Sequence, residues 1–539
     1  MNVLLVNLPY VGIDFNNPNR SAVEHQVVYP PIGLMYLAGR LIGMDFVDRI
    51  ECLDFNLFDY SGLSSQEDCI AFISERLYKY CQREKCVVCV SLMFTESYNF
   101  FEIFERCVKK VMPGSTLICG GCHASNTPDI ILQRNPGVDF VICGEGEDAL
   151  PLLIKNISKG CGDNIVGVHH RGNIKALPQG GFESAPVAMD IDMNLSAYEL
   201  FDMEAYTKAS KKFTLSKKDA DQKYFPIIAS RGCPGHCTFC SSHTVHGRTP
   251  RWRSLDNIRH EIVLLCNKYG VTEINLSDDS FLPKQKFIEL LEMLSGLSID
   301  GLSILVSNLS VNHTDNAVLD AMSKAKVDTL VLAIESGNKE MQKEIRKHCD
   351  LDKAVSLVRY AKAIGLNTWC YYLIGFPEET VEQMNETIEF MRHAGSDWVS
   401  IIVVTPHPGA EMYKQFVVLG YIDDSPQSWM GLSLRNRTFD TSEISAKEIN
   451  ELAYTANLMY NFVNNRHIDN RRYVEAERIF LRVVDIYDFH VFAWDCLRRV
   501  YALTNRHDEA EKITRKIKQL LETNPASKGF VKYMHLLEE

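Results

Sequence analysis

The sequence predicts an α/β chain with an N-terminal doubly wound parallel sheet, a central partial (β/α)6 barrel and an all-α tail. Short β-branched runs alternate with amphipathic stretches in two successive series, and the C-terminal part changes to a helical pattern. A chain of 539 residues, 46% of them hydrophobic, is too long for one core. We place the domain limits at residues 1–160, 161–223 (a linker with a hairpin), 224–441 and 442–539.

Composition excludes several classes of function. Apolar runs stay below the roughly 18 residues of a membrane span, and the start MNVLLVNLP lacks the flanks of a signal peptide. We therefore expect a soluble, cytoplasmic protein without a membrane partner. The net charge of −12 argues against nonspecific nucleic-acid binding, because phosphate contacts need a surplus of Lys and Arg.

Seventeen cysteines are many for a reducing compartment, where disulfides are rare. Cys86 and Cys89 share an expected strand and point to opposite faces, which favours core packing over metal binding. Cys119 and Cys122 bracket a Gly-Gly turn. For that pair packing is the favoured interpretation, and metal binding stays open as the alternative.

The first series of apolar runs predicts a βαβ parallel sheet. Its expected strands are NVLLVNL, RIECLDF, VVCVSLMF, STLICGG and VDFVICG, and its helices include IGLMYLAGRLIG and NFFEIFERCVKKVM. A Gly-Asn turn within IVGVHHRGNIKAL predicts a hairpin. The Lys- and Ser-rich stretch 207–223 is typical of an exposed linker.

The second series predicts six βα units, hence a parallel barrel or partial barrel. Its expected strands are PIIASRGC, EINLSDDSF, SILVSNLS, TLVLAIESG, NTWCYYLIGFP and WVSIIVVTPHPG. Polar and turn residues gather where these strands end. Because ligands bind at the carboxyl ends of parallel strands, we expect the active site there.

The tail carries a faint repeat, because residues 475–477 (EAE) recur 34 residues later as 509–511. This is the period of the tetratricopeptide repeat. Large and small residues fall in matching register, namely Ala476, Phe480, Trp494, Leu497, Tyr501 and Ala510. The tail therefore resembles a short repeat pair. Two interpretations stay open: a helical cap on the barrel, or a surface that binds a protein partner.

The segment ASRGCPGHCTFCSSH places three cysteines as C-x-x-x-C-x-x-C directly after an expected strand. Thiolates at this spacing bind an iron–sulfur cluster or zinc. His236 and His243 could complete a zinc site. The position at a barrel mouth favours the cluster, since three thiolates leave one iron open for a ligand.

From about Tyr224 to Tyr421 the chain resembles the radical S-adenosylmethionine superfamily, whose C-x-x-x-C-x-aromatic-C loop is matched by Cys233, Cys237, Phe239 and Cys240. In that family the cysteines hold a [4Fe–4S] cluster, which cleaves S-adenosylmethionine into methionine and a 5′-deoxyadenosyl radical. The resemblance implies metal ligation by the three cysteines and a donor such as flavodoxin or ferredoxin. It implies S-adenosylmethionine contacts at Phe239, Asp278, Asp279, Asn308, Glu335, Ser336 and Gly375. Helix capping is the alternative role of the two aspartates.

Residues 1 to about 160 are similar to the Rossmann-like cobalamin-binding domain of one subgroup of that family. The matching pieces are YPPIGLMYLAGRL, SLMFTE, GGCHASNTP and VDFVICGEGEDALPLL. The resemblance implies cobalamin contacts at Tyr10, Pro31, Ser91, Thr95, Gly120, Gly121, His123, Gly144, Glu145 and Gly146. The D-x-H-x-x-G motif that offers a histidine to cobalt elsewhere is absent, so we do not expect His123 on the metal. Glu145 and Glu147 could equally hold a domain interface.

The resemblance implies a methyltransferase that uses both cofactors to place a methyl group on an unactivated carbon of a small molecule from natural-product or cofactor biosynthesis. One alternative is radical oxidation, cyclisation or rearrangement without methyl transfer. Methylthiotransferases rank lower, because the sequence lacks their second set of three cysteines in an N-terminal domain. The alternative from another class is a cobalamin-binding sensor or scaffold with a structural metal. The substrate is not readable from the chain.

Overall fold

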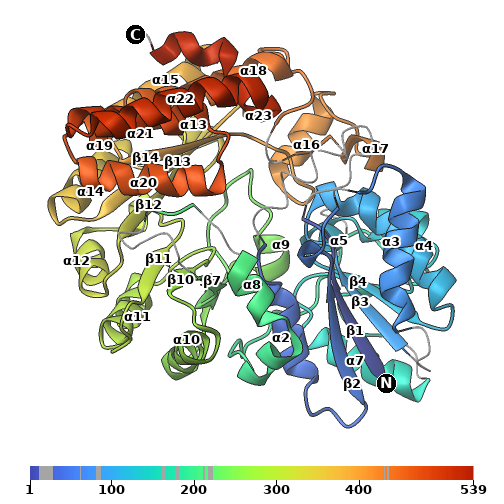
Figure 1. The fold of residues 1–539 in the computed structure, drawn as a ribbon. Coiled ribbons are helices and arrows are strands. Elements are labelled where there is room, and N and C mark those ends of the chain that lie inside the picture. Colours follow the sequence, from blue (N-terminus) through green and yellow to red (C-terminus); the bar gives the residue numbers. More distant parts are fainter. Residues whose placement is uncertain are drawn as a thin grey trace. The chain divides into compact units, whose positions relative to one another are not determined.

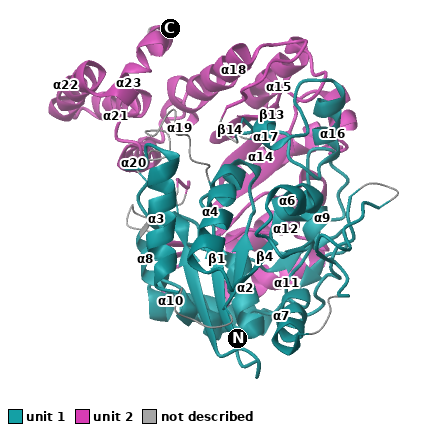
Figure 2. Cartoon of the chain, turned by 90° about the vertical axis from the view of Figure 1, so that its right-hand side faces the viewer, with its two compact units in different colours: residues 1–210, 225–270, 405–433 teal, residues 211–224, 271–404, 434–539 magenta. Residues whose placement is uncertain are grey.

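The structure is a computed structural model that forms two compact units, each built from segments far apart in the sequence (Figure 2). Unit 1 comprises residues 1–210, 225–270 and 405–433. Unit 2 comprises residues 211–224, 271–404 and 434–539. The residues that the structure describes are 1–10, 28–60, 62–80, 86–160, 164–177, 181–209, 213–215, 223–429, 431–433 and 436–537.

Unit 1 contains a six-stranded sheet of order β2-β1-β3-β4-β5-β6. Figure 1 labels its first four strands, β1 to β4. Its strands are β1 (Asn2–Asn7), β2 (Arg49–Asp54), β3 (Cys86–Ser91), β4 (Thr116–Gly120), β5 (Phe140–Ile142) and β6 (Val168–His169). The first five are parallel and confirm the five predicted runs. The order 2-1-3-4-5 belongs to doubly wound sheets that bind ligands where the winding reverses, here between β1 and β3.

Helices cover both faces of this sheet, and α2 lies on the opposite side from α3 and α4 (Figure 1). Local signals set their limits. Ser65 caps the start of α3 through its side chain, and α7 ends at Gly160, whose φ of 65° is left-handed. The helices of the N-terminal part are α2 (Ile32–Leu41), α3 (Gln66–Tyr78), α4 (Tyr98–Val111), α5 (Cys122–Asn126), α6 (Pro128–Arg134) and α7 (Ala149–Lys159).

The predicted hairpin at residues 165–177 is wrong in its pairing. The turn exists, since Asn173 and Ile174 both donate their N–H to the carbonyl of His170. However, β6 pairs antiparallel with β5 and extends the sheet, and Ala176 bridges to Phe182 instead. Without β6, the backbone N–H and C=O groups along the edge of β5 would be unpaired. The first half of the predicted hairpin therefore pairs with β5 and not with the second half.

The rest of unit 1 follows the sheet in sequence. A two-stranded antiparallel ribbon pairs β8 (Ser230–Arg231) with β9 (Arg251–Trp252) and closes the loop that carries the three cysteines. The remaining elements are η3 (Leu195–Leu200), α8 (Met203–Ala209), α9 (His243–His246), α10 (Leu255–Tyr269), α16 (Glu411–Val418) and α17 (Pro426–Trp429). The strand β7 (Tyr224–Ile227) spans the boundary between the units.

Unit 2 is built on five parallel strands, which confirm five more predicted runs. They are β10 (Glu273–Leu276), β11 (Ser303–Val306), β12 (Thr329–Glu335), β13 (Asn367–Ile374) and β14 (Trp398–Val403). β10 pairs with β11, and β12, β13 and β14 pair in that order. Parallel bridges at Ile304–Val327 and Leu309–Leu332 link β11 to the neighbourhood of β12. The intervening helices are α11 (Lys284–Ser295), α12 (Asn316–Lys324), α13 (Lys339–Glu344), α14 (Leu351–Ala363) and α15 (Val381–Ala394).

The C-terminal region of unit 2 is helical, as the sequence predicts. Its elements are α18 (Ala446–Leu458), the π-helical turn η5 (Met459–Val463), α19 (Arg466–Asp469), α20 (Tyr473–Ile486), α21 (Val491–Leu503), α22 (His507–Thr523), α23 (Pro525–Lys528) and η6 (Val531–Leu537). The last helices share one core cluster with Trp398, at the start of β14. No helix in the described part of the chain is long and apolar enough to cross a membrane.

The same region closes the edge of β14. The amide of Asn461 accepts from Val399 N at 3.0 Å and donates to Val399 O at 2.9 Å, as a neighbouring strand would. Arg472 pairs with Asp397, the residue before β14. The helices α19 and α20 therefore begin at the amino ends of the strands, opposite to the edge where parallel sheets bind ligands.

Candidate active site

The three cysteines lie in an irregular loop between β8 and α9. All three are half-buried. A Cβ atom added at Gly235 would lie 3.3 Å from Cys233 Sγ and 3.9 Å from Cys237 Sγ, so these two sulfurs lie near the same point. Cys240 N donates to Cys237 O at 3.3 Å and folds the third cysteine back towards the second. The loop therefore brings the thiols of Cys233 and Cys237 near one point, and its backbone turns back at Cys240.

This arrangement favours a cluster over a single zinc ion. Among the described residues, no three His, Cys, Asp or Glu side chains are grouped to hold one ion, and His236 is exposed. Structural zinc needs four donors converging on one atom. A [4Fe–4S] cluster takes each thiolate on a different iron, so three cysteines suffice to hold it and leave its fourth iron free for a ligand.

The loop lies against the end of the six-stranded sheet within unit 1. Asn126 Nδ2, at the end of α5, donates to Thr244 Oγ1 at 3.0 Å. Cys122 Sγ lies 3.7 Å from Ser241 Oγ, and the carbonyl of Thr238 accepts from Met412 N at 2.9 Å. Because α5 directly follows β4, these contacts place the cysteine loop at the carboxyl edge of the sheet. Cys122 thus contacts the loop, whereas Cys119 is a buried strand residue whose thiol pKa is raised by burial.

That carboxyl edge carries the residues predicted to contact cobalamin. Gly121 has φ +104°, and a Cβ there would lie 2.7 Å from Leu92 O, so only glycine fits. Ser91 and Gly120 are paired at the ends of β3 and β4. Gly144, with φ +86°, begins the turn after β5 that also contains Gly146.

Two further predicted contacts belong to the neighbouring loops of the same edge. The hydroxyl of Tyr10 donates to Tyr29 O at 2.7 Å, so that side chain is engaged within the chain. Pro31 is buried and precedes α2. These glycine-bordered strand ends suit a broad ligand that approaches the backbone closely, as the corrin does.

His123 is buried beneath aromatic rings at this edge. Its Nδ1 lies 3.0 Å from Thr95 Oγ1, and its ring packs edge-on against Trp429 at 4.6 Å between centroids. Burial, together with the nearby His407, lowers the pKa of His123 to about 3, so the imidazole is neutral at physiological pH. Its Nε2 is buried and has no hydrogen-bond partner among the described residues. An unsatisfied nitrogen here fits a site that receives a ligand rich in amide groups, which cobalamin is.

Glu145 is engaged within the chain. Its oxygens lie 2.7 and 2.8 Å from the guanidinium of Arg251, and Oε1 lies 2.8 Å from His246 Nδ1. Burial opposes ionisation of Glu145, but the hydrogen bonds from His246 and Arg251 outweigh it and lower the pKa of the carboxyl to about 2. Glu147 pairs with Arg231 at 2.5 Å. Both carboxylates therefore face the segments that flank the cysteine loop.

In unit 2 the predicted S-adenosylmethionine contacts lie at successive strand ends. Asp278 is buried and Asp279 exposed, both just after β10. Asn308 and Glu335 follow β11 and end β12, with φ values of +60° and +72°. Left-handed backbone is costly for residues other than glycine and concentrates at functional sites. Lys347 Nζ lies 3.0 Å from Glu335 Oε1 and holds that carboxylate in place.

Ser336 is fully buried and engaged in its own turn. Its Oγ lies 3.2 Å from Thr387 Oγ1 and accepts from Asn338 N at 3.1 Å. The hydroxyl therefore fixes the loop between β12 and α13. Any contribution of Ser336 to a ligand comes through this positioning.

The turn after β13 is held by two side chains that the sequence reasoning missed. Glu379 Oε2 accepts from Gly375 N at 2.5 Å and from Phe376 N at 3.0 Å. Arg437 donates to the carbonyl of Gly375, and to Val404 O at 3.2 Å. Both backbone groups of Gly375 are thus used within the chain, and its φ of +85° sets the path of the turn.

Burial shifts the pKa of both side chains that hold this turn, Glu379 and Arg437. It raises the pKa of Glu379 to about 7, against the hydrogen bonds from the two amides, and lowers the pKa of Arg437 to about 10. Glu379 lies in the GFPEET segment, where an acidic residue two positions after proline was a usable signal. Arg437 is 62 residues from Gly375, so no local pattern indicates it.

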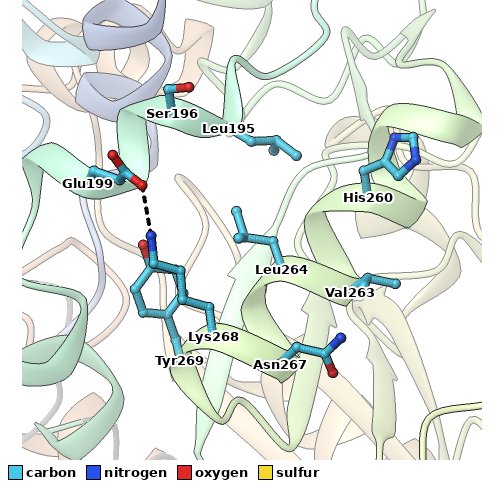
Figure 3. Close-up of a pocket in the computed structure, with 9 residues that line it drawn as sticks. All are labelled: Leu195, Ser196, Glu199, His260, Val263, Leu264, Asn267, Lys268 and Tyr269. Atoms are coloured by element: carbon cyan, nitrogen blue, oxygen red, sulfur yellow. Dashed lines mark hydrogen bonds and ion pairs between the residues drawn. The ribbon is translucent and has the colours of Figure 1, made fainter.

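A separate groove of about 460 Å³ lies between η3 and α10 (Figure 3). Leu195, Val263 and Leu264 supply its apolar lining, and an ion pair of 2.8 Å joins Glu199 to Lys268. It contains none of the predicted site residues. The groove is therefore distinct from the cysteine loop and from the strand ends.

Comparison with known proteins supports both halves of this arrangement. Residues 227–391 match the radical SAM superfamily model, and residues 23–154 match the B12 binding domain model. The solved structure of the cobalamin-dependent S-adenosylmethionine radical enzyme OxsB, with aqua-cobalamin bound, has the same fold. It matches 99% of this chain and 83% of its own, with a TM-score of 0.63 at 15% identity.

Three curated proteins resemble the chain over most of its length. An uncharacterised methyltransferase of Pyrococcus horikoshii is 26% identical over 402 residues, 74% of this chain and 81% of that protein. Cytidylyl-2-hydroxyethylphosphonate methyltransferase of Streptomyces wedmorensis is 25% identical, covering 70% and 76%. The anaerobic magnesium-protoporphyrin IX monomethyl ester cyclase of Synechocystis is 25% identical, covering 77% of each. The chain therefore belongs to the cobalamin-dependent radical S-adenosylmethionine enzymes, whose cofactors are a [4Fe–4S] cluster, S-adenosylmethionine and cobalamin.

Proposed function

We propose that this enzyme is a methyltransferase that places a methyl group on an unactivated carbon of a small molecule. The observation that carries the proposal is the position of the cysteine loop on the carboxyl edge of the cobalamin-type sheet, within one compact unit. With both cofactors bound, S-adenosylmethionine supplies a radical that removes hydrogen and cobalamin supplies the methyl group. Two relatives named as methyltransferases support the proposal of methyl transfer. Because both cofactor domains belong to one chain, the radical forms on the protein that also carries the methyl donor.

The proposed roles of the residues follow the strand ends. Cys233, Cys237 and Cys240 hold the cluster, and Phe239 packs beside the adenine. The proposed S-adenosylmethionine contacts in unit 2 are Asp278, Asp279, Asn308, Glu335, Ser336 and Gly375. The proposed cobalamin contacts in unit 1 are Tyr10, Pro31, Ser91, Thr95, Gly120, Gly121, His123, Gly144 and Gly146. For Glu145 we propose the other role that the sequence left open, at the domain interface, because Arg251, His246 and Ala188 N occupy its oxygens. The chain's own task is to orient these groups, and we propose a cytoplasmic flavodoxin or ferredoxin as electron donor.

We keep the domain limits at 1–160, 161–223, 224–441 and 442–539, with a partial (β/α)6 barrel in the third. The five parallel strands of unit 2 support the barrel. For the tail, the 34-residue recurrence of Ala476 at Ala510, with both side chains in one core cluster, supports a tetratricopeptide-like pair. Its attachment at the amino end of β14 favours a partner-binding surface over a lid on the carboxyl ends of the strands.

The test uses S-adenosylmethionine with a deuterated methyl group, supplied to anaerobically reconstituted enzyme with candidate substrates. We expect S-adenosylhomocysteine and 5′-deoxyadenosine to form together, with the label in the product. One cofactor molecule gives the methyl group and a second gives the radical. Product that forms with 5′-deoxyadenosine but without S-adenosylhomocysteine or label would overturn methyl transfer.

The second candidate is an oxidative cyclase or rearrangement enzyme, which the similarity to the Synechocystis cyclase supports. It shares the cofactors and the hydrogen-abstraction step. The same labelled experiment separates the two, because a cyclase consumes no methyl group and leaves unlabelled product.

A further inference from the structure

Five buried or half-buried ionisable side chains connect both ends of the cysteine loop to the turn after β5. We call them the carboxylate clamp: Glu145, Glu147, Arg231, His246 and Arg251. Their side chains are 1%, 6%, 4%, 31% and 5% exposed. All belong to unit 1, and the two carboxylates come from the sheet domain while the three bases flank the cysteines.

The entry to the loop is fixed by Arg231, two residues before Cys233. Arg231 Nη1 lies 2.5 Å from Glu147 Oε1 and 3.5 Å from Glu145 Oε1. The guanidinium also stacks over the ring of Tyr36 at 4.3 Å from its centroid, on helix α2 of the same sheet domain. The backbone that leads into the first cysteine is thereby attached to that domain at three side chains.

The exit of the loop is fixed by His246 and Arg251. His246 ends α9, six residues after Cys240, and its Nδ1 lies 2.8 Å from Glu145 Oε1. Arg251 binds the same carboxylate with both terminal nitrogens, at 2.7 and 2.8 Å, and donates to His246 O at 2.9 Å. Arg231 on β8 is paired with Arg251 on β9, so the two strands that enter and leave the cysteine loop, its two stems, are also joined to each other.

The turn that presents the carboxylates is itself rigid. Gly144, with φ +86°, donates its N–H to Ser125 Oγ at 3.0 Å, and a Cβ there would lie 3.2 Å from Ala185 O. Glu145 Oε2 further accepts from Ala188 N at 2.7 Å. Glu145 is a buried carboxylate with four hydrogen bonds, two of them from Arg251. It cannot move without leaving the buried charges of Glu145 and Arg251 unpaired, which costs more than breaking a surface pair.

We propose that Glu145 is a positioning residue for the cysteine loop, so that the cluster site is built jointly by the loop and the cobalamin-type domain. The inference rests on the proposed ligation by the three cysteines. It assigns Glu145 to the loop instead of the corrin, because its oxygens are already occupied by Arg251, His246 and Ala188 N. The sheet domain then has a second role, which is to hold the cluster ligands in place whether or not cobalamin is bound.

The test compares Glu145→Gln with Glu261→Gln in the full chain. Glu261 is a matched control: it is equally buried, pairs with Arg253 at 2.6 Å and accepts from Tyr198, and both of these partners lie outside residues 230–252, which hold the cysteine loop and its two strands. After anaerobic reconstitution, iron, acid-labile sulfide and cobalamin are counted, and the rate of cluster loss to an iron chelator is followed. Removing an outer partner of metal ligands typically weakens metal binding by 10- to 100-fold. We therefore expect about tenfold faster cluster loss in Glu145→Gln than in Glu261→Gln, with cobalamin content unchanged.

Two results would overturn the proposal. One is equal cluster loss in the two variants. The other is loss of cobalamin from Glu145→Gln with the cluster retained, which would make Glu145 a corrin contact. If Glu145→Gln does not fold, His246→Gln takes its place, because that half-exposed side chain removes one bond to the carboxylate and leaves the arginines. A wild-type chain that takes up no cluster would refute the proposed ligation itself, which distinguishes the two failures.

Discussion

Replacing Gly375 with alanine should disrupt the turn after β13 by strain and by collision together. At φ +85°, an L-residue is strained by about 1–2 kcal/mol. The added Cβ would also meet the side chain of Ile449 and lie 2.8 Å from Arg437 Nη2. Both neighbours are fully buried, and overpacking of this kind costs about 1–3 kcal/mol. We expect Gly375→Ala to destabilise β13 and its turn by about 2–5 kcal/mol.

Gly365→Ala is the matched control, because Gly365 has the same φ of +85° and nothing within 4 Å of its added Cβ. It should cost only the strain, about 1–2 kcal/mol. Hydrogen exchange of peptides covering β13 gives the local opening free energy of both variants, and 5′-deoxyadenosine formation gives activity. Gly375→Ala should lose activity while Gly365→Ala keeps it. Equal destabilisation and equal activity in the two variants would refute the steric part of the reasoning.

Three further predictions concern buried polar groups. The pKa of Glu379 rises from 4.5 to about 7 on folding, so its stabilising effect is complete below pH 4.5 and lost as the pH rises through 7. Wild type should lose about 2.5 kcal/mol of stability from pH 5 to 8 that Glu379→Gln does not lose, and parallel pH profiles would contradict this. The cob(II)alamin form should show no nitrogen superhyperfine splitting in electron paramagnetic resonance, because the D-x-H-x-x-G motif is absent and we expect the cofactor's own dimethylbenzimidazole to be off the cobalt; axial nitrogen coupling that His123→Gln removes would reverse this. Asn461→Ala should lower the unfolding free energy by at least about 2 kcal/mol, since two buried groups of Val399 lose their partner, whereas the exposed Asn464→Ala should have little effect in the same denaturant titration.

The sequence predicted the strands well because buried parallel strands are continuous apolar runs bounded by turns. The run VVCVSLMF became β3, and TLVLAIESG became β12. The cysteine loop was equally readable, since its spacing is local. What the pattern missed depends on contacts between distant segments, such as β6 pairing with β5.

In the candidate site, too, the residues placed by local sequence were predicted, and those placed by contacts between distant segments were not. Strand ends bring Asn308, Glu335 and Gly375 to predictable positions, because a strand's carboxyl end is visible in the sequence. Arg437 was missed because it reaches the Gly375 turn from beyond β14, the last strand of unit 2. For Glu145, the sequence left two roles open, and only the positions of Arg251 and His246 show where its oxygens point.

The central claim is that three cysteines of one loop hold the cluster that cleaves S-adenosylmethionine. Its most direct test measures 5′-deoxyadenosine formed by reduced, reconstituted enzyme and by the variants Cys233→Ala, Cys237→Ala and Cys240→Ala. We expect the wild type to form 5′-deoxyadenosine and each variant to form none. The fold should survive in each variant because the loop lies outside the sheets, and circular dichroism checks this. Cleavage at the wild-type rate in any one of the three variants would contradict the account.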